Sequence, residues 1–299
     1  MSDDPLEGTV AWRELQVEAR EALAGASVER PDQEAAWLVE EASGMDRTEL
    51  VLGRDLPATV GGVARLDAMV ARRCAGEPIQ YVLGHWSFRS LDLLVDRRVL
   101  IPRPETEQVA TEALAALDAV VARRSDGHRP VAVDLGTGSG ALALAIATER
   151  PGTDVWATDR SPDAVEVARA NLAGLGMAGR RVRLTVGSWF EPVPDELRGA
   201  VDLVVSNPPY VSTAEPLDAS VTSWEPAEAL YAGSTGLDAY RTLVPEAGEW
   251  LAPGGALVLE LGAGQGEAVG ELAQRAGFVA VRVVADLAGL DRTLVAERP

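Results

Sequence analysis

The sequence predicts an α/β fold built on a mostly parallel sheet, preceded by a smaller helical region. From residue 106 onward, apolar runs typical of buried strands alternate with amphipathic helical segments. Such an alternation of strand and crossover helix gives a parallel sheet with helices on both faces. Before residue 85, apolar side chains recur only at helical spacing. The chain is therefore expected to contain two parts of different architecture.

Residues 1–84 are expected to form a small helical bundle. The first helix carries an apolar stripe at helical spacing, made of Trp12, Leu15, Ala19 and Leu23. A second helix is expected to start near Asp32 and to end at Gly44, and a third to cover residues 63–73. A bundle of this kind serves either as a packing domain or as a docking surface for a macromolecular partner. We expect docking, because of the function inferred below.

Residues 85–104 are expected to form a β-hairpin linker. Two short apolar stretches, 91–95 and 99–101, are separated by Asp96-Arg97-Arg98, which predicts a turn between two strands. Two prolines then stiffen the exit from this segment. The remaining part, residues 105–299, is expected to form the α/β domain.

The α/β domain is expected to contain seven strands. They are predicted at 131–136, 154–159, 182–187, 201–206, 256–262, 279–285 and 292–297. Helices are predicted at 106–124 and near 140–149, 162–173, 239–251 and 265–276. Only residues 286–291 join the last two strands, too few for a crossover helix, so these strands are expected to form an antiparallel hairpin at one edge of the sheet.

The bulk composition excludes several classes of function. The 299 residues carry a formal net charge of −19, which argues against binding to a phosphate backbone through Lys and Arg, so no direct nucleic-acid partner is expected. Cys74 is the only cysteine, which excludes an intrachain disulfide or a cysteine-based metal cluster, and no metal is expected. The acidic start is unlike a secretory signal, and no apolar run reaches the roughly 18 residues of a membrane span. A cytoplasmic protein with no membrane partner is expected.

A glycine-rich loop leaves the first predicted strand of the α/β domain and enters a helix. It comprises Gly136, Thr137, Gly138, Ser139 and Gly140. The three glycines allow a sharp turn and a close approach to a ligand. Their spacing is G-x-G-x-G, and neither the G-x-G-x-x-G fingerprint nor a P-loop is present. Asp134, just before the loop, would repel a pyrophosphate and suits a cationic amino group. The alternative is a glycine-rich turn with no ligand.

Asp159 ends the next predicted strand, nineteen residues after Gly140. A carboxylate at this place typically accepts hydrogen bonds from both hydroxyls of a ribose. Alone, it could equally cap the helix that starts at Pro162. Taken with the glycine loop, it indicates a nucleoside with an amino-acid tail, and the expected cofactor is S-adenosylmethionine. Trp189 or Phe190, after the third strand, can stack on adenine, although either can also fill the core.

The stretch Ser206-Asn207-Pro208-Pro209-Tyr210 follows the apolar run 201–205. Prolines lack an N–H and cannot continue a sheet ladder, so the chain must leave the sheet at Asn207. By itself the stretch is either a strand-ending turn or a grip for a planar group that carries an NH2. The Asn207 side-chain carbonyl and the Pro208 backbone carbonyl can accept its N–H groups, and Tyr210 can pack on its plane.

The glycine loop and Asp159 place the cofactor across from this stretch, which favours the grip. Asn207 is then expected close to the sulfonium end of the cofactor. We expect Asn207, Pro208 and Tyr210 to be catalytic and the whole of Asn207, Pro208, Pro209 and Tyr210 to bind substrate.

The glycine loop combined with Asn-Pro-Pro-Tyr resembles the Rossmann-like methyltransferases that act on planar amino groups, including the DNA adenine enzymes. Further motifs narrow the resemblance. Ile79-Gln80-Tyr81-Val82-Leu83-Gly84 and the run from Val99 to Glu107 look like the release factor glutamine methyltransferase family (HemK/PrmC), of class I S-adenosylmethionine-dependent enzymes. Residues 225–230 and 264–269 fit the same family. The similarity runs from about residue 76 to the C-terminus.

The resemblance implies a seven-stranded Rossmann-like methyltransferase sheet and a defined reaction. The family methylates the side-chain amide of the glutamine in the Gly-Gly-Gln loop of peptide chain release factors. Its cofactor contacts fall here on Gly136 to Gly140, Asp159, Trp189 and Asn207. Its substrate motif falls on Asn207 to Tyr210. Ser188 stands where the family often has an acid, which weakens any expected hydrogen bond to the adenine amino group.

Two other functions stay open at this point. One is a DNA or RNA adenine amino-methyltransferase, and the other is an inactive cofactor-binding adaptor. The segment 211–238 is long and aperiodic, so it is expected to act as a lid or a partner-contact surface. Arg103 and Glu107 either face the cofactor or fix the angle between the domains. His85 and His128 lie outside the motifs and are expected to be surface or linker residues.

Overall fold

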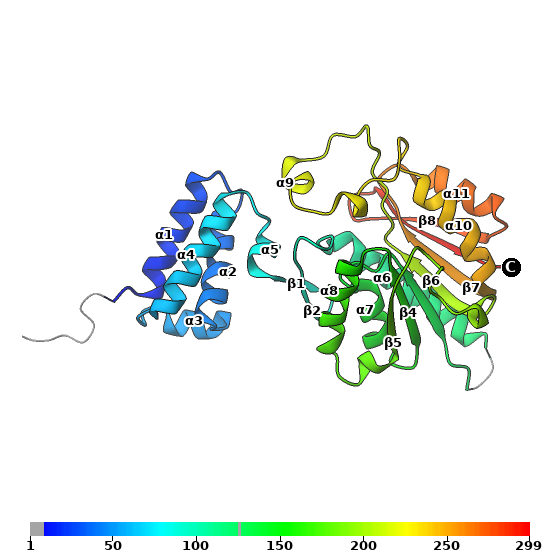
Figure 1. Ribbon diagram of the computed structural model, residues 1–299, viewed down its shortest axis with the longest axis horizontal. Helices are drawn as coiled ribbons and strands as arrows, with labels where there is room; N and C mark the ends of the chain where they lie inside the picture. The colour runs from blue at the N-terminus through cyan, green and yellow to red at the C-terminus, as the bar shows by residue number, and fades with distance from the viewer. Residues whose placement is uncertain (1–8, 125–126) are drawn as a thin grey trace, which may run out of the picture. The chain divides into compact units, whose positions relative to one another are not determined.

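The computed structural model describes residues 9–124 and 127–299. Contacts divide the chain into two compact units, residues 1–84 and 85–299 (Figure 1). Each unit has its own hydrophobic core.

The first unit is helical, as the spacing of its apolar residues predicts. Its helices are α1 (Trp12–Gly25), α2 (Pro31–Ser43), α3 (Arg47–Gly53), α4 (Val60–Cys74) and α5 (Ile79–Leu83). The apolar stripe of α1 is buried along its whole length, together with side chains of α2 and α4 such as Leu38 and Leu66. The two short helices were not expected. Asp46 and Glu49 form a capping box at the start of α3, a signal that the sequence does contain.

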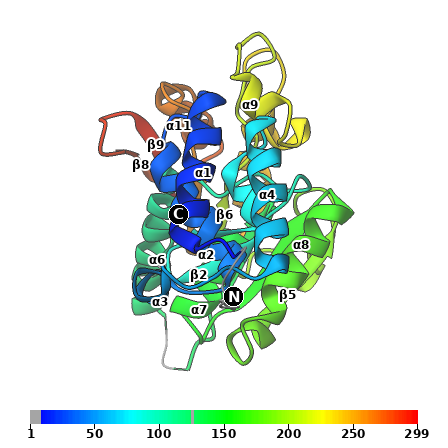
Figure 2. The ribbon, with the colours of Figure 1, turned by 90° about the vertical axis from the view of Figure 1, so that its left-hand side faces the viewer.

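The second unit is a seven-stranded sheet covered by helices, as predicted. Its strands are β3 (Val131–Leu135), β4 (Asp154–Asp159), β5 (Val182–Val186), β6 (Val201–Ser206), β7 (Leu251–Glu260), β8 (Val279–Ala285) and β9 (Asp291–Glu297), in the spatial order β5-β4-β3-β6-β7-β9-β8. Neighbours from β5 to β7 pair in parallel. The last strand, β9, is antiparallel to both β7 and β8, which confirms the expected terminal hairpin. The connection between β8 and β9 extends from the edge of the sheet (Figure 2).

Alternate strand residues supply two separate cores, because side chains of a strand point to opposite faces. Leu203 and Val205 join one core with α6 (Pro104–Ala122) and α7 (Ala141–Glu149). Val204, between them, joins the other core, which contains α10 (Asp238–Trp250) and α11 (Gly266–Arg275). Helix α8 (Pro162–Ala173) lies against β4 and β5. Both faces are buried, so the strands read as nearly continuous apolar runs.

The remaining elements are short. They are the 3-10 turns η1 (Ala178–Arg181), η2 (Asp195–Leu197) and η3 (Ala227–Ala229), and the helix α9 (Ala219–Thr222). The segment that carries α9 extends away from the sheet in both views (Figures 1 and 2). In the described residues, no helix is both long and apolar enough to cross a membrane.

The predicted hairpin was wrong in its strands. The hairpin joins β1 (His85–Phe88) to β2 (Leu91–Leu94), and residues 96–99 form a hydrogen-bonded turn outside it. Arg89, with φ +54°, makes the two-residue turn and donates its backbone N–H to Glu107. Phe88 and Leu91 bury their side chains in the core of the second unit, so tertiary packing selects this pairing. By its contacts the hairpin belongs to the second unit.

Helix α4 contains adjacent glycines in opposite environments. A Cβ on Gly62 would lie 2.6 Å from the Trp12 ring, whereas a Cβ on Gly61 would meet nothing within 4 Å. We expect Gly62→Ala to destabilise the first unit by about 1–3 kcal/mol through overpacking. Gly61→Ala should be neutral or stabilising by up to about 1 kcal/mol, because alanine loses less backbone entropy than glycine when the helix forms. Urea unfolding of the full chain, followed by circular dichroism, compares the two; equal effects would contradict the close packing of α1 on α4.

Candidate active site

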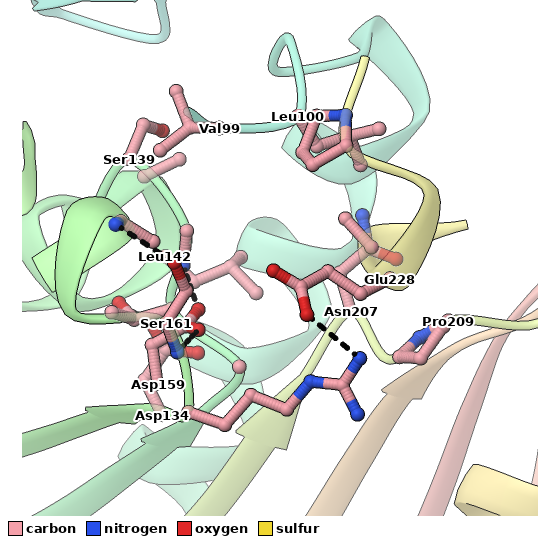
Figure 3. A pocket seen from close by; sticks show the side chains of 18 of the residues that line it. Val99, Leu100, Asp134, Ser139, Leu142, Asp159, Ser161, Asn207, Pro209 and Glu228 are labelled. Atoms are coloured by element: carbon pink, nitrogen blue, oxygen red, sulfur yellow. Dashed lines mark hydrogen bonds and ion pairs between the residues drawn. The ribbon is translucent and has the colours of Figure 1, made fainter. Parts of the chain in front are cut away.

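A cavity lies at the carboxyl ends of the central strands (Figure 3). It is lined by the loop after β3, by Asp159 to Ser161 after β4, by Gly187 to Trp189 after β5, and by Asn207 and Pro209 after β6. Further parts of the wall come from segments 98–102 and 226–229, from Thr106, and from residues of α7 and α8 (Ala141, Leu142 and Ala164). Ligands of open parallel sheets bind at this edge, where the order of the strands reverses.

The glycine loop turns back over the edge of the sheet in a way that requires glycine. Gly136, Gly138 and Gly140 all have positive φ, between 55° and 88°. The backbone N–H groups of Gly136 and Thr137 both donate to the carbonyl of Thr158, at 2.9 Å each. Of the loop, Gly136 to Ser139 line the cavity, whereas Gly140 caps α7 behind it.

Asp134 lies beneath this loop and is almost fully buried. Its Oδ2 accepts from the Thr137 hydroxyl at 2.6 Å and from the Ala143 N–H at 3.1 Å. Its Oδ1 is buried without a hydrogen-bond partner among the described residues, although Asp134 lines the cavity. Burial raises the pKa of this carboxyl to about 7. The unpartnered oxygen suits the cationic amino group of S-adenosylmethionine, which would also return the pKa towards its ordinary value.

Asp159 stands on the opposite side of the glycine loop. Each of its carboxylate oxygens accepts one backbone N–H, from Gly138 and from Ser161, both at 2.9 Å. Each oxygen keeps a second lone pair, so the carboxylate can still accept a ribose hydroxyl. Burial raises its pKa. The predicted helix cap at this point is made instead by Ser161, whose hydroxyl accepts from the Ala164 N–H.

The structure separates the two aromatic candidates for adenine stacking. Trp189 lines the cavity and has φ +46°, with its carbonyl held by the Thr158 hydroxyl at 2.8 Å. Phe190 instead stacks on Trp250 in the core, with ring centroids 5.1 Å apart. Trp189 is thus the aromatic side chain placed to contact a ligand.

The four residues of the Asn-Pro-Pro-Tyr stretch have different surroundings. Asn207 and Pro209 line the cavity, and Pro208 is buried behind them. Tyr210 turns its hydroxyl to Glu260, 3.3 Å away. The sequence therefore located this turn, but only Asn207 presents a polar side chain to the cavity from it.

A polar network behind Asn207 was not foreseen from the sequence. Asn207 Nδ2 donates to the Thr106 hydroxyl at 3.3 Å, and this hydroxyl donates to Glu260 Oε2 at 2.7 Å. Glu260 is 1% exposed, and burial raises its pKa to about 7. Thr106 lies in the run 99–107 and Glu260 is the last residue of β7, so the only local signal was a polar residue at the end of an apolar strand.

The segment 211–238 contacts residues 97–103 beside the cavity. Glu225 is buried, accepts the Ile101 N–H at 3.1 Å and forms an ion pair with Arg103. Trp224 stacks under the guanidinium of Arg97, 4.0 Å from the ring centroid. Arg103 therefore fixes this segment within the second unit, which favours neither of the roles predicted for it.

A second, exposed ion pair lies at the mouth of the cavity. Arg160, which follows Asp159, contacts Glu228 at 3.1 Å, and both residues line the cavity (Figure 3). Glu107 accepts the Arg89 N–H on the hairpin, away from the cavity lining. His85 and His128 also lie outside the lining, where they contact Asp92 and Asp202.

The fold is that of the Rossmann-like methyltransferases. Residues 113–223 match the family model described as methyltransferase small domain, and residues 14–84 match the PrmC N-terminal domain. A solved methyltransferase from Pyrococcus furiosus covers 76% of this chain and 96% of its own, with TM-score 0.50 and 19% identity. The catalytic domain of hMettl16 bound to an RNA hairpin covers 83% of this chain and 85% of its own, with TM-score 0.54 and 13% identity. Likeness at this identity shows the fold alone.

Curated sequences define the family. The release factor glutamine methyltransferase of Geobacter sulfurreducens is 41% identical over 274 residues, 91% of each chain. That of Moorella thermoacetica is 42% identical over 285 residues, 94% of this chain and 96% of its own. The chain belongs to the release factor glutamine methyltransferase family.

The buried carboxyl of Asp134 makes stability depend on pH. Its pKa is raised from 3.8 to about 7, so the folded state keeps the proton that the unfolded state loses first. The stabilisation is complete below about pH 4 and is lost as the pH rises through about 7. Between about pH 4.5 and 6.5 this one group lowers the free energy of unfolding by about 1.4 kcal/mol per pH unit.

We expect Asp134→Asn to remove the contribution of Asp134 to the change in free energy of unfolding with pH. Urea unfolding of the cofactor-free protein across this pH range measures it in the transition of the second unit. Glu260 has the same direction of shift and retains its own share in the variant. A slope identical in wild type and variant would show that Asp134 is ionised in the folded protein throughout.

Proposed function

We propose that this protein transfers a methyl group from S-adenosylmethionine to the side-chain amide nitrogen of a glutamine in peptide chain release factors. The glutamine of their Gly-Gly-Gln loop is the proposed target, on the motif resemblance. The observation that carries the proposal is the placement of Asn207. The chain belongs to this family, and its Asn207 side chain lies directly after β6, in the same cavity as the glycine loop and Asp159.

The cofactor is assigned to the cavity by the chemistry of its lining. Gly136 to Ser139 offer a close backbone surface, and Gly140 supports them as the cap of α7. Asp134 Oδ1 suits the amino group, and Asp159 suits the ribose hydroxyls. Trp189 supplies an aromatic face for adenine, whereas Ser188 offers a hydroxyl where the motif resemblance leads us to expect an acid.

The substrate amide needs orientation above all, because its nitrogen lone pair is delocalised into the carbonyl. Asn207 Oδ1 and the Pro208 carbonyl are proposed to accept the two amide N–H groups, and the Tyr210 ring to pack on the amide plane. This fixes the direction of the lone pair and places acceptors where positive charge develops. Pro209 closes the turn on the cavity side.

S-adenosylmethionine supplies an electrophilic methyl group: the new N–C bond forms as the C–S bond breaks, and its electron pair stays on sulfur. The methylated amide nitrogen is then strongly acidic and gives its proton to solvent. The side chains that line the cavity therefore need to supply acceptors, and no general base has to act before attack. The absence of histidine from the lining agrees with this.

Two other parts of the proposal concern the whole chain. The first unit, residues 1–84, is proposed to dock the release factor, and residues 211–238 are proposed to contact the substrate beside the cavity. The protein is proposed to act in the cytoplasm, where release factors function. The net charge of −19 disfavours a direct nucleic-acid partner.

The proposal is tested with labelled S-adenosylmethionine and three acceptors: a release factor, its Gly-Gly-Gln→Gly-Gly-Ala variant, and DNA or RNA. We expect label on the intact release factor alone. Label on nucleic acid would instead identify an adenine amino-methyltransferase, and no label on any acceptor would identify a cofactor-binding adaptor.

Asn207→Ala should lower kcat for the release factor by about 10² to 10³-fold, since an acceptor aimed at developing charge is lost. The dissociation constant for the cofactor should change far less, because other residues make most of the proposed contacts. Rapid-quench kinetics and calorimetry measure the two quantities. Turnover at the wild-type rate would refute the grip at Asn207.

Asp159→Ala should weaken cofactor binding by about 10- to 100-fold, from loss of a charged acceptor. Asp163→Ala is the matched control, because it removes an exposed carboxylate four residues away that does not line the cavity. Calorimetry with S-adenosylmethionine compares them. Equal dissociation constants for the two variants would remove Asp159 from the ribose site.

A further inference from the structure

We propose that Thr106 and Glu260 are positioning residues that set which end of the Asn207 amide faces the substrate. The inference rests on the proposed function, because it concerns how Asn207 receives an amide N–H. It assigns a task to a buried acid and a buried hydroxyl that make no contact with the cofactor in the scheme above.

The three residues come from separate elements that converge at the cavity wall, where Asn207 and Thr106 line the cavity and Glu260 lies outside the lining. Thr106 lies in the first turn of α6, Glu260 is the last residue of β7, and Asn207 follows β6. The contacts form a chain of 3.3 Å from Asn207 Nδ2 to the Thr106 hydroxyl and 2.7 Å from this hydroxyl to Glu260 Oε2. Thr106 is 4% exposed and Glu260 is 1% exposed, so water does not compete for these bonds.

The direction of the bonds follows from the number of protons. An ionised Glu260 can only accept, so it takes the single hydroxyl proton of Thr106. The Thr106 oxygen is then left with lone pairs alone, and it can only accept from Asn207. Asn207 must present Nδ2 to Thr106, and Oδ1 is the end that remains for the cavity.

The other orientation would defeat the reaction. With Nδ2 turned to the cavity, Asn207 would offer donors to a substrate nitrogen that itself carries two donors. The substrate amide would then lose an acceptor for one N–H and its orientation with it. A single buried acid, acting through one hydroxyl, thereby distinguishes two amide orientations that have the same shape.

The surroundings of Glu260 decide when the chain of bonds holds. Tyr210 donates to Oε1 at 3.3 Å, and Tyr240 donates to the backbone carbonyl at 2.8 Å. Burial, and to a smaller extent Glu105, favour the neutral form of Glu260. The hydrogen bonds from Thr106 and Tyr210 and the charge of Arg292 favour the ionised form, and the balance brings the pKa to about 7. Below that pH the carboxyl gains a proton of its own, Thr106 is free to turn its hydroxyl towards Asn207, and the preference is lost.

The test compares a variant that replaces the Thr106 hydroxyl by a methyl group with one that keeps the hydroxyl. Thr106→Val removes the relay, and Thr106→Ser keeps it. Thr293→Val is the matched control, since Thr293 pairs with Glu260 across β7 and β9 and its buried hydroxyl has no partner among the described residues. At saturating cofactor we expect Thr106→Val to lower kcat about tenfold, the effect of losing one hydrogen bond. Thr106→Ser and Thr293→Val should stay within about twofold of wild type, because each keeps the relay bond.

The pH profile separates positioning from mere packing. In wild type, kcat at saturating cofactor should fall as the pH drops through about 7, the pKa of Glu260. In Thr106→Val this acid limb should vanish, because protonation of Glu260 no longer reaches Asn207. A Thr106→Val enzyme with wild-type kcat, or one that keeps the acid limb, would overturn the proposal while leaving the methylation reaction intact.

A readout without turnover keeps the inference independent of the substrate. The side-chain 15N–H2 signals of Asn207, assigned through their loss in Asn207→Ala, should shift with pH in wild type, Thr106→Ser and Thr293→Val. They should not shift in Thr106→Val. If wild type fails to methylate the release factor, the proposed function fails, and these signals alone decide the positioning role: an identical titration in all variants would refute it.

Discussion

The site depends on the forced end of strand β6. This strand pairs on both sides, with β3 and β7, and every one of its residues is buried. Ser206, the last residue of β6, donates its side-chain hydroxyl to the Leu135 carbonyl at 2.6 Å. Two prolines cannot extend such a ladder, so the chain leaves the sheet between the two neighbouring strands. That exit delivers Asn207 to the same edge at which β3 releases the glycine loop.

Around this exit the protein buries acids that would be more stable in water. Asp134 and Glu260 are each about 1% exposed, and burial raises the pKa of both to about 7. The two acids differ in their partners. Both oxygens of Glu260 accept hydrogen bonds from the protein, whereas one oxygen of Asp134 has no hydrogen-bond partner among the described residues. The Glu260 carboxyl is therefore suited to holding neighbouring side chains in place, and the Asp134 carboxyl is suited to binding a ligand.

The far wall of the cavity is made by chain segments that are distant in sequence. Glu225 receives the Ile101 N–H and the Arg103 guanidinium, so residues 98–102 and 226–229 are held together at the cavity. Breaking this ion pair is costly, because without the guanidinium the buried carboxylate would be an unpaired charge. The segment 211–238 thereby contributes to the wall of the cavity.

The sequence by itself determined the fold class and the edge of the sheet that carries the site. Strand runs, crossover helices and glycine spacing are local patterns, and they located the loop at 136–140, Asp159 and the turn at Asn207 because each pattern reflects a local backbone constraint. Tertiary structure decided the contacts between residues that lie far apart in the sequence. It moved the hairpin to 85–94, because Phe88 and Leu91 bury together, and it placed Phe190 in the core. It also brought Thr106 and Glu260 behind Asn207, a contact across 154 residues that no local pattern encodes.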